Sequence, residues 1–386
     1  MTSARTGEGI SGRNCAVAII GTRGYPSYYG GFETAVRRLA PFLCDEGWDV
    51  TVYGRKGATI AGDPSRDTRV NSVGTLGWEK KSLSTLSYGL TSVLHAAVRR
   101  PDVALIMNVA NGYWLPILKL RGIPTVVNVD GMEWERSKWG PLAKTVFKIG
   151  AKLTARYADH LITDAKEIQR RWLTEFNRTS IFIPYGGDAV EELPLEKNLS
   201  HRGYVLLVAR FVPENTVGEF LKAAEIIADK YPVVLVGGSG YGGPLDEQAR
   251  DLSERISNIT WLGHISDDVR LFSLFQHAGA YFHGHSVGGT NPALVQAMAC
   301  GAPIVARDTV FNREVLAGTA LFCDPNAHDI YEKVISSLED VELSDERGRL
   351  ARERAANHYS WRGVCESYDE VLRSSLAANA QQGVTA

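Results

Sequence analysis

The segment HGHSVGGTNPALVQAMACG, residues 283–301, combines residue types that could bind an anion. Gly288, Gly289, Thr290 and Asn291 stand immediately before a helical pattern that starts near Pro292. Unpaired backbone N–H groups and the positive end of a helix dipole favour a negative ligand at such a place. An ordinary capped helix start would use the same residues, so the remaining sequence has to distinguish the two interpretations.

A second pair of glycines follows the first predicted strand. In GTRGYPSYYGGFETAVRRLAPFL (21–43), Gly30 and Gly31 precede a helical pattern that begins at Phe32. Glycine lets a bulky anion approach the backbone, and it also serves turns that need a positive φ. The dinucleotide motif G-x-G-x-x-G is absent from this loop. It does occur at 238–243, but after the second strand of its half and without an acidic residue for a ribose, so a dinucleotide site is not predicted.

Two charged residues stand at the carboxyl ends of predicted strands. Arg210 closes the strand in VARFVPEN (208–215), where it could hold phosphate oxygens with both guanidinium nitrogens or simply lie on the surface. Asp130 ends the strand in NVDGMEWERSKWG (128–140), where a carboxylate could accept a proton, accept a sugar hydroxyl, or cap the next segment. Both remain candidates for a site.

No metal site is predicted. His283 and His285 have the spacing that places two rings on one face of a strand, but no acidic or cysteine ligand is near them in the sequence. The chain also lacks any Asp-x-Asp pair. A bound diphosphate would therefore be neutralised by helix N-termini and basic side chains.

One helical pattern, residues 142–158, carries a regular row of cations. They recur every four residues and alternate with apolar residues, which suits an anionic membrane surface, although a solvated helix face has the same pattern. The cations are Lys144, Lys148, Lys152 and Arg156, and the apolar residues are Leu142, Val146, Phe147, Ile149 and Leu153.

Strands and helices that could position these residues alternate along the whole chain. Short apolar runs typical of parallel strands with both faces covered are predicted in each half, with helical patterns between them. They lie at 15–21, 49–55, 102–108, 125–131, 160–165 and 180–186, then at 204–210, 233–238, 259–264, 280–285, 303–308 and 320–324. This order predicts two doubly wound α/β domains whose strand ends face an interdomain cleft.

Bulk properties agree with a two-domain globular protein of a reducing compartment. The 386 residues exceed one ordinary core, and a hydrophobic fraction of 44% with 22% charged residues is typical of globular proteins. No apolar run reaches the roughly 18 residues that span a bilayer, and the polar start predicts no signal peptide. Five scattered cysteines favour neither a disulfide framework nor a zinc site. We therefore expect a cytoplasmic location.

The charges and the polar segments suggest the domain limits. Residues 1–190 carry 25 Lys and Arg against 17 Asp and Glu, and residues 191–386 carry the remaining 17 against 27. Such an asymmetry is typical of two domains with different partners. The predicted organisation is a tail (1–13), an N-terminal acceptor-side domain (14–186), a linker (187–202), a C-terminal donor domain (203–360), a helix returning to the first domain (361–378) and a tail (379–386).

Taken together, these segments resemble the family-4 glycosyltransferases of the GT-B fold over nearly the whole chain, closest to a bacterial rhamnosyltransferase-like branch. The segments that carry the resemblance are GTRGYPSYYGGFET, NVDGMEWERSKWG, YADHLITDA, ARFVPEN and HGHSVGGTNPALVQAMACG. The resemblance implies two Rossmann-like domains, with a nucleotide-sugar donor held mainly by the C-terminal one.

The resemblance also assigns roles to particular residues. It implies that Arg210 binds phosphate, that Gly289, Thr290 and Asn291 cradle the donor, and that Gly30 and Gly31 approach the diphosphate. Asn215 stands where many members have a lysine, and Asp130 where many have an active-site histidine. Two positions depart from the family: Gln296 and Ser286 replace glutamates expected near the ribose and the donor sugar. Gln296 can still donate and accept hydrogen bonds, but without the stronger charge-assisted ones.

The sequence thus predicts transfer of a hexose, with rhamnose as one candidate, from a nucleotide-diphosphate sugar to a saccharide acceptor. Asp130 and Arg210 are the predicted catalytic residues. No metal, cofactor or nucleic acid is expected. The resemblance implies retention of configuration, and the cationic row at 144–156 together with the basic first half suggests a lipid-linked acceptor at the inner membrane face. Two alternatives stay open: a sugar-nucleotide epimerase of similar architecture, and a partner subunit whose catalysis is impaired by the loss of both glutamates.

Overall fold

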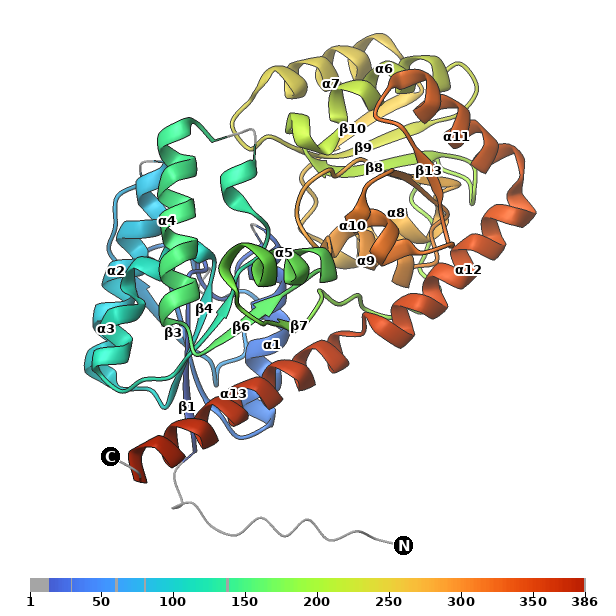
Figure 1. The fold of residues 1–386 in the computed structure, drawn as a ribbon. Coiled ribbons are helices and arrows are strands. Elements are labelled where there is room, and N and C mark those ends of the chain that lie inside the picture. Colours follow the sequence, from blue (N-terminus) through green and yellow to red (C-terminus); the bar gives the residue numbers. More distant parts are fainter. Residues whose placement is uncertain (1–13, 29, 60–61, 80, 137–138, 385–386) are drawn as a thin grey trace, which may run out of the picture. The chain divides into compact units, whose positions relative to one another are not determined.

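The computed structural model describes residues 14–28, 30–59, 62–79, 81–136 and 139–384, and Figure 1 shows the path of the chain. The first sheet and its connections contain β1 (Ala16–Ile20), α1 (Gly31–Asp45), β2 (Asp49–Arg55), β3 (Asn71–Thr75), α2 (Lys81–Arg99), β4 (Val103–Met107), η1 (Val109–Trp114), α3 (Leu115–Leu120), β5 (Thr125–Asn128), η2 (Glu133–Glu135), α4 (Pro141–Tyr157), β6 (His160–Thr163), α5 (Lys166–Phe176) and β7 (Ile181–Phe182).

The second sheet and its connections follow directly. They contain β8 (Val205–Arg210), η3 (Pro213–Asn215), α6 (Val217–Ile227), β9 (Val233–Gly238), α7 (Pro244–Arg255), β10 (Ile259–Gly263), α8 (Asp268–His277), β11 (Ala280–His283), α9 (Pro292–Ala299), β12 (Ile304–Arg307), α10 (Val310–Leu316), β13 (Leu321–Cys323), α11 (Ala327–Glu339), α12 (Val341–His358) and α13 (Trp361–Val384).

The first sheet has seven strands in the order β3-β2-β1-β4-β5-β6-β7. Its central strand β1 pairs in parallel with both neighbours, so that Ile19 lies opposite Val52 of β2 and Leu105 of β4. These side chains are fully buried, as their unbroken apolar sequence predicts. The edge strand β3, with the sequence NSVGT, was not predicted, because an edge strand needs neither two buried faces nor an apolar run.

The second sheet has six strands in the order β10-β9-β8-β11-β12-β13, and all six were predicted. Alternate residues of β8 face two separate cores. Val205 and Leu207 pack with α6, α7 and α11, whereas Leu206 packs with α8, α9, α10 and α12. Figure 1 shows α6 and α7 across the sheet from α8 and α9. This is the expected doubly wound arrangement.

The strand order reverses between β8 and β11. From β8 the chain runs outward through β9 to β10, and then returns through α8 to β11 on the other side of β8. The carboxyl ends of these two strands, Arg210 and His283, therefore flank the point where ligands bind in open α/β sheets. The loops that follow β8 and β11 are thus the first place to look for a site.

The chain packs as two compact units. Unit 1 comprises the described parts of residues 1–127, 153–160 and 369–386, and unit 2 comprises those of 128–152 and 161–368. Within unit 1, the end of α13 is held by Asp369, which accepts a hydrogen bond from Trp48 Nε1 at 2.6 Å, and by Arg373, which donates to the Glu46 carbonyl at 2.9 Å. The predicted limits at 14–186, 187–202, 203–360 and 361–378 stay predictions. Of the helices in the described part of the chain, none is both long and apolar enough to cross a bilayer.

Candidate functional site

The loop between β11 and α9 has the geometry of an anion cradle. Gly288 adopts a φ of +100°, a conformation that glycine tolerates, and α9 begins four residues later. Asn291 is the N-cap, because its Oδ1 accepts the N–H of Ala293 at 3.0 Å. The Asn291 side chain therefore acts as an ordinary cap. Among the described residues, however, none accepts the N–H of Gly288 or Gly289, so these two donors remain available to a ligand.

The turn after β8 is tied to this loop by hydrogen bonds. Ser286 donates both its N–H and its hydroxyl to the Glu214 carbonyl, at 3.0 and 2.7 Å. Asn215 is buried and donates its Nδ2 to the Arg210 carbonyl at 2.9 Å. Arg210 itself is exposed at the strand end. Ser286 thus joins the two strand-end loops, and Asn215 closes the turn after β8, while the Arg210 side chain is accessible for binding.

Asp164, which the sequence analysis did not select, lies directly against the glycine loop. Its side chain is buried, and its backbone carbonyl accepts both the N–H and the hydroxyl of Thr290. A Cβ built on Gly289 would lie 2.1 Å from Asp164 Oδ1, so the carboxyl occupies the space that glycine leaves free. The available signal was a carboxylate that ends the otherwise apolar strand HLITDA. Its partner Gly289, however, lies 125 positions further along the chain, so the sequence alone does not show the contact.

Asp130 belongs to the same cluster in unit 2. It adopts a φ of +53°, and its N–H donates to Asn128 Oδ1 at 2.9 Å. Its carboxylate lies 3.7 Å from Arg136 Nη2, and that arginine also pairs with Glu133 at 2.7 Å. Arg136 was missed as well, because its sequence context shows no strand end. It approaches the glycine loop, since Arg136 Nη2 would lie 3.9 Å from a Cβ built on Gly288.

The charges of this cluster fix the protonation of its members. Burial would lower the pKa of Arg136, but Glu133, Asp130 and further carboxylates raise it, so the guanidinium stays charged. Burial raises the pKa of Asp164 well above its usual range, and the charge of Asp130 raises it further. Burial lowers the pKa of His285 to about 3, with smaller contributions from the charges of Arg210 and Arg136. The cluster therefore combines fixed cations with an imidazole that stays neutral near pH 7.

Two histidines at the carboxyl end of β11, His283 and His285, form a stacked pair. Their ring centroids are 4.4 Å apart with an interplanar angle of 10°, which confirms that they share one face. Tyr281 Oη lies 2.9 Å from His283 Nδ1. His283 Nε2 and His285 Nδ1 are buried and have no hydrogen-bond partner among the described residues. Burial also lowers the pKa of His283 well below its usual value, so both rings are neutral.

Gln296, on α9, uses both ends of its amide within the protein. Its Oε1 accepts the N–H of Asp188 at 2.9 Å, and its Nε2 donates to the Asp188 carbonyl at 3.0 Å. The side chain is buried. Gln296 therefore anchors the segment around residue 188, and its predicted contact with a donor stays a prediction.

Gly30 and Gly31 belong to unit 1. Gly30 is the N-cap of α1 with extended backbone, and Gly31 is the first helical residue. In the first turn of α1, the buried carboxylate of Glu33 accepts the N–H of Arg23 at 3.0 Å. The loop after β1 thus ends at a helix N-terminus as predicted, and its role in binding a diphosphate stays a prediction.

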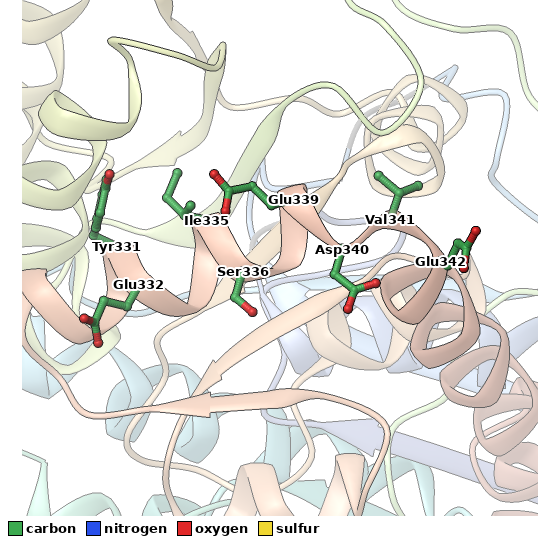
Figure 2. Close-up of a pocket in the computed structure, with 8 residues that line it drawn as sticks. All are labelled: Tyr331, Glu332, Ile335, Ser336, Glu339, Asp340, Val341 and Glu342. Carbon is green, nitrogen blue, oxygen red and sulfur yellow. The ribbon is translucent and has the colours of Figure 1, made fainter.

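A separate hollow of about 830 Å³ opens between α11 and α12, and Figure 2 shows its lining. Four of its residues are acidic, namely Glu332, Glu339, Asp340 and Glu342. None of the predicted site residues lines it, and its charge would repel a diphosphate. The cluster around the glycine loop is therefore the better candidate for an anion site.

Comparisons with known proteins agree with this architecture. The family described as glycosyl transferases group 1 matches residues 191–354, and the glycosyl transferase 4-like domain matches residues 30–185. The O-antigen chain mannosyltransferase B of Escherichia coli is 29% identical over 201 residues, which cover 49% of this chain and 50% of that protein. The phosphatidyl-myo-inositol mannosyltransferase of Mycolicibacterium smegmatis is 32% identical over 232 residues, 57% of this chain and 58% of that protein.

The fold is also found among solved structures. The sucrose-phosphate synthase from Thermosynechococcus elongatus superimposes with a TM-score of 0.79 at 18% identity, covering 94% of this chain and 100% of that chain. Such a likeness establishes the fold alone. The matched regions span only about half to three fifths of the two curated relatives named above.

Proposed function

The chain belongs to the family-4 type of GT-B glycosyltransferases, and we propose that it transfers a hexose from a nucleotide-diphosphate sugar to a saccharide acceptor. One observation carries the proposal: the N–H groups of Gly288 and Gly289, which have no acceptor in the part of the chain that the structure describes, lie in the loop after β11, next to the strand that ends at Arg210. Backbone donors, a helix N-terminus and an arginine are the groups that neutralise a diphosphate.

The leaving diphosphate would be stabilised by these same groups. Negative charge grows on the diphosphate as its bond to the sugar breaks. Arg210 supplies a positive charge there and the N-terminal end of α9 supplies a helix dipole, so no metal ion is required in this scheme. The neutral His285 leaves the positive charge to the arginines. We propose retention of configuration, with the leaving phosphate accepting the proton of the incoming hydroxyl on the same face.

Asp130 would act on the sugar side of the reaction. Its carboxylate lies 3.7 Å from Arg136 Nη2, and this ion pair orients it. From there it would orient the acceptor hydroxyl or stabilise an oxocarbenium-like centre. We assign Gly30, Gly31, Asn215, Ser286, Thr290, Asn291 and Gln296 to donor binding or to holding the donor loops.

We propose rhamnose or mannose as the first donors to test, the second because both curated relatives named above are mannosyltransferases. A lipid-linked saccharide at the inner face of the plasma membrane is the proposed acceptor, in the synthesis of a cell-surface polysaccharide or glycolipid. The cationic helix α4 would bring the protein to that surface.

Replacing Arg210 by Ala tests the proposal. We expect at least a tenfold loss of transfer, about 1.4 kcal/mol of barrier, because the leaving diphosphate loses its charged partner. Transfer is measured by mass spectrometry of the acceptor with UDP-, GDP- and dTDP-sugars. Arg255→Ala is the matched control, since the ion pairs of that arginine with Asp251 of α7 and Glu225 of α6 are exposed. An unchanged rate in Arg210→Ala would remove Arg210 from the site.

A partner subunit with impaired catalysis is the second candidate. It is favoured by Gln296, whose amide is fully used by the Asp188 backbone where the family resemblance calls for a glutamate on the ribose. The two candidates differ in one measurement. A catalytic chain transfers sugar by itself, whereas a partner subunit would do so only after both Ser286 and Gln296 are changed to Glu.

A further inference from the structure

Asp164 has no part in the proposed reaction, yet it makes the closest contacts to the donor loop. Its carbonyl accepts the N–H of Thr290 at 3.2 Å as well as the Thr290 hydroxyl. This segment, immediately after β6, thus fixes the residue that follows the two glycines. Thr290 is itself buried, so the contact is shielded from water.

The Asp164 carboxyl also shapes the loop by filling space. A Cβ on Gly289 would approach its Oδ1, Cγ and Oδ2 to 2.1, 2.4 and 2.6 Å, well inside any allowed contact. Gly289 has no positive φ, so its requirement for glycine comes from this carboxyl and not from backbone conformation. Asp164 Oδ1 is buried and has no hydrogen-bond partner among the described residues.

The surroundings of the carboxyl set its charge. Charges from two other segments reach it: Asp130 and Arg136 before α4, and Glu314 on α10. The hydroxyl of Tyr368 on α13, whose pKa Asp164 raises in turn, is a neutral neighbour. Burial and the two carboxylates raise its pKa, and Arg136 offsets only part of this rise. A protonated carboxyl has one O–H donor and no net charge, which is compatible with a buried position beside an anion site.

We propose that Asp164 is a positioning residue of the donor site: its carbonyl and its carboxyl together hold the Gly288–Thr290 loop in the form that exposes the glycine N–H groups to the diphosphate. The inference rests on the proposed function, because it names what keeps that site preformed. A loop ordered before binding loses less conformational freedom when the donor arrives.

The test compares Asp164→Ala with Asp164→Asn. Asparagine keeps the size and the neutral charge of a protonated carboxyl, whereas alanine removes the contact with Gly289. We expect Ala to weaken the binding of UDP, GDP or dTDP at least tenfold in calorimetry and to speed amide exchange of residues 286–296 at least tenfold. We expect Asn to stay within threefold of the native chain in both measurements. Asp267→Ala is the control, because that aspartate also holds backbone N–H groups, at the start of α8.

A second variant covers the case in which Asp164→Ala does not fold. Gly289→Ala forces its Cβ onto the carboxyl, so it should produce the same loss of binding and the same faster exchange. Gly318→Ala, whose Cβ would meet nothing within 4 Å, is its control.

The outcomes separate the inference from the proposed function. If the amide exchange of residues 286–296 is as slow as in the native chain in both Asp164→Ala and Gly289→Ala, the inference is overturned while donor binding stands. The inference is also overturned if Asp164→Asn is as defective as Asp164→Ala. A native chain that binds none of the three nucleotides would overturn the proposed function, and the exchange rates would still decide whether Asp164 orders the loop.

Discussion

Gln296 illustrates how an amide and a carboxylate differ at one position. Its amide donates to the Asp188 carbonyl and accepts the Asp188 N–H, which is a pairing that needs one donor and one acceptor. An ionised glutamate offers two acceptors and would face the Asp188 carbonyl with a repulsive oxygen. The residue expected from the family resemblance is therefore incompatible with the local hydrogen bonding of this chain.

We predict that Gln296→Glu lowers the free energy of unfolding by about 1–3 kcal/mol, because a buried hydrogen bond is lost. Chemical denaturation near pH 7 measures the change. Gln276→Glu is the matched control: Gln276 bridges the Leu193 N–H and the Glu191 carbonyl in the same way, but at a more exposed place where water can substitute. A Gln296→Glu chain that is as stable as the native chain would contradict this account.

The candidate site was only partly predictable from single residues. The loop at Gly289 and the N-cap at Asn291 follow from local sequence, because a helix start depends on its own neighbours. Asp164 and Arg136 could not be found in this way, because their importance comes from contacts with residues more than 120 positions away. Burial of a carboxyl, the feature that marks Asp164, has no local signature.

At the scale of elements, sequence patterns succeed where both faces of a strand are buried. All six strands of the second sheet were predicted, and α9 begins at Pro292 as expected. The strand β3 was missed, because it lies at a sheet edge with a polar sequence. The strand predicted at 125–131 ends at Asn128, where the loop that carries Asp130 begins. Strand ends are thus less predictable than strand centres, and the site residues lie at the ends.

Helix α4 carries the proposed membrane contact. Lys148, Lys152 and Arg156 are exposed, Lys144 is half-buried, and Leu142 is 80% exposed. Phe147, one of the apolar residues of the stripe, is instead buried and packs on Trp139 with ring centroids 5.1 Å apart. The exposed surface is therefore less apolar than the sequence pattern indicated, although Leu142 and Ile149 stay exposed, and we expect electrostatic attraction to dominate.

We predict that Lys148→Glu with Lys152→Glu abolishes most binding to vesicles rich in anionic lipid. Each lysine near such a surface contributes about 1 kcal/mol, so their loss alone weakens binding roughly 30-fold. Sedimentation with anionic and neutral vesicles at 0.1 M salt measures the effect. Lys222→Glu with Lys230→Glu, two exposed lysines on and just after α6, controls for net charge. Equal binding of the native chain to both kinds of vesicle would contradict the prediction.

At the scale of the whole molecule, stability has to be measured for each compact unit. Asp164 and the charged groups that shift its pKa (Asp130, Arg136 and Glu314) belong to unit 2. Two units need not unfold in one step, so a single transition temperature would mix them. Hydrogen exchange in denaturant, measured on the peptide of α5 that follows Asp164, reports on unit 2 by itself.

The raised pKa of Asp164 predicts how the stability of unit 2 depends on pH. In the folded state the carboxyl keeps its proton above the ordinary value of 3.8, whereas the unfolded chain releases it near that value. The stabilisation is therefore complete below about pH 4 and is lost as the pH rises toward the folded pKa, by about 1.4 kcal/mol per pH unit. The asparagine of Asp164→Asn cannot titrate at this position. The free energy of unfolding of this variant, minus that of the native chain, should therefore increase from pH 4 upward and then level off. Subtracting the two curves cancels the titrations that both chains share, to the extent that they are independent of residue 164. Parallel curves between pH 4 and pH 8 would mean that Asp164 is ionised in the folded protein, and the glycine loop would then lie against a buried charge.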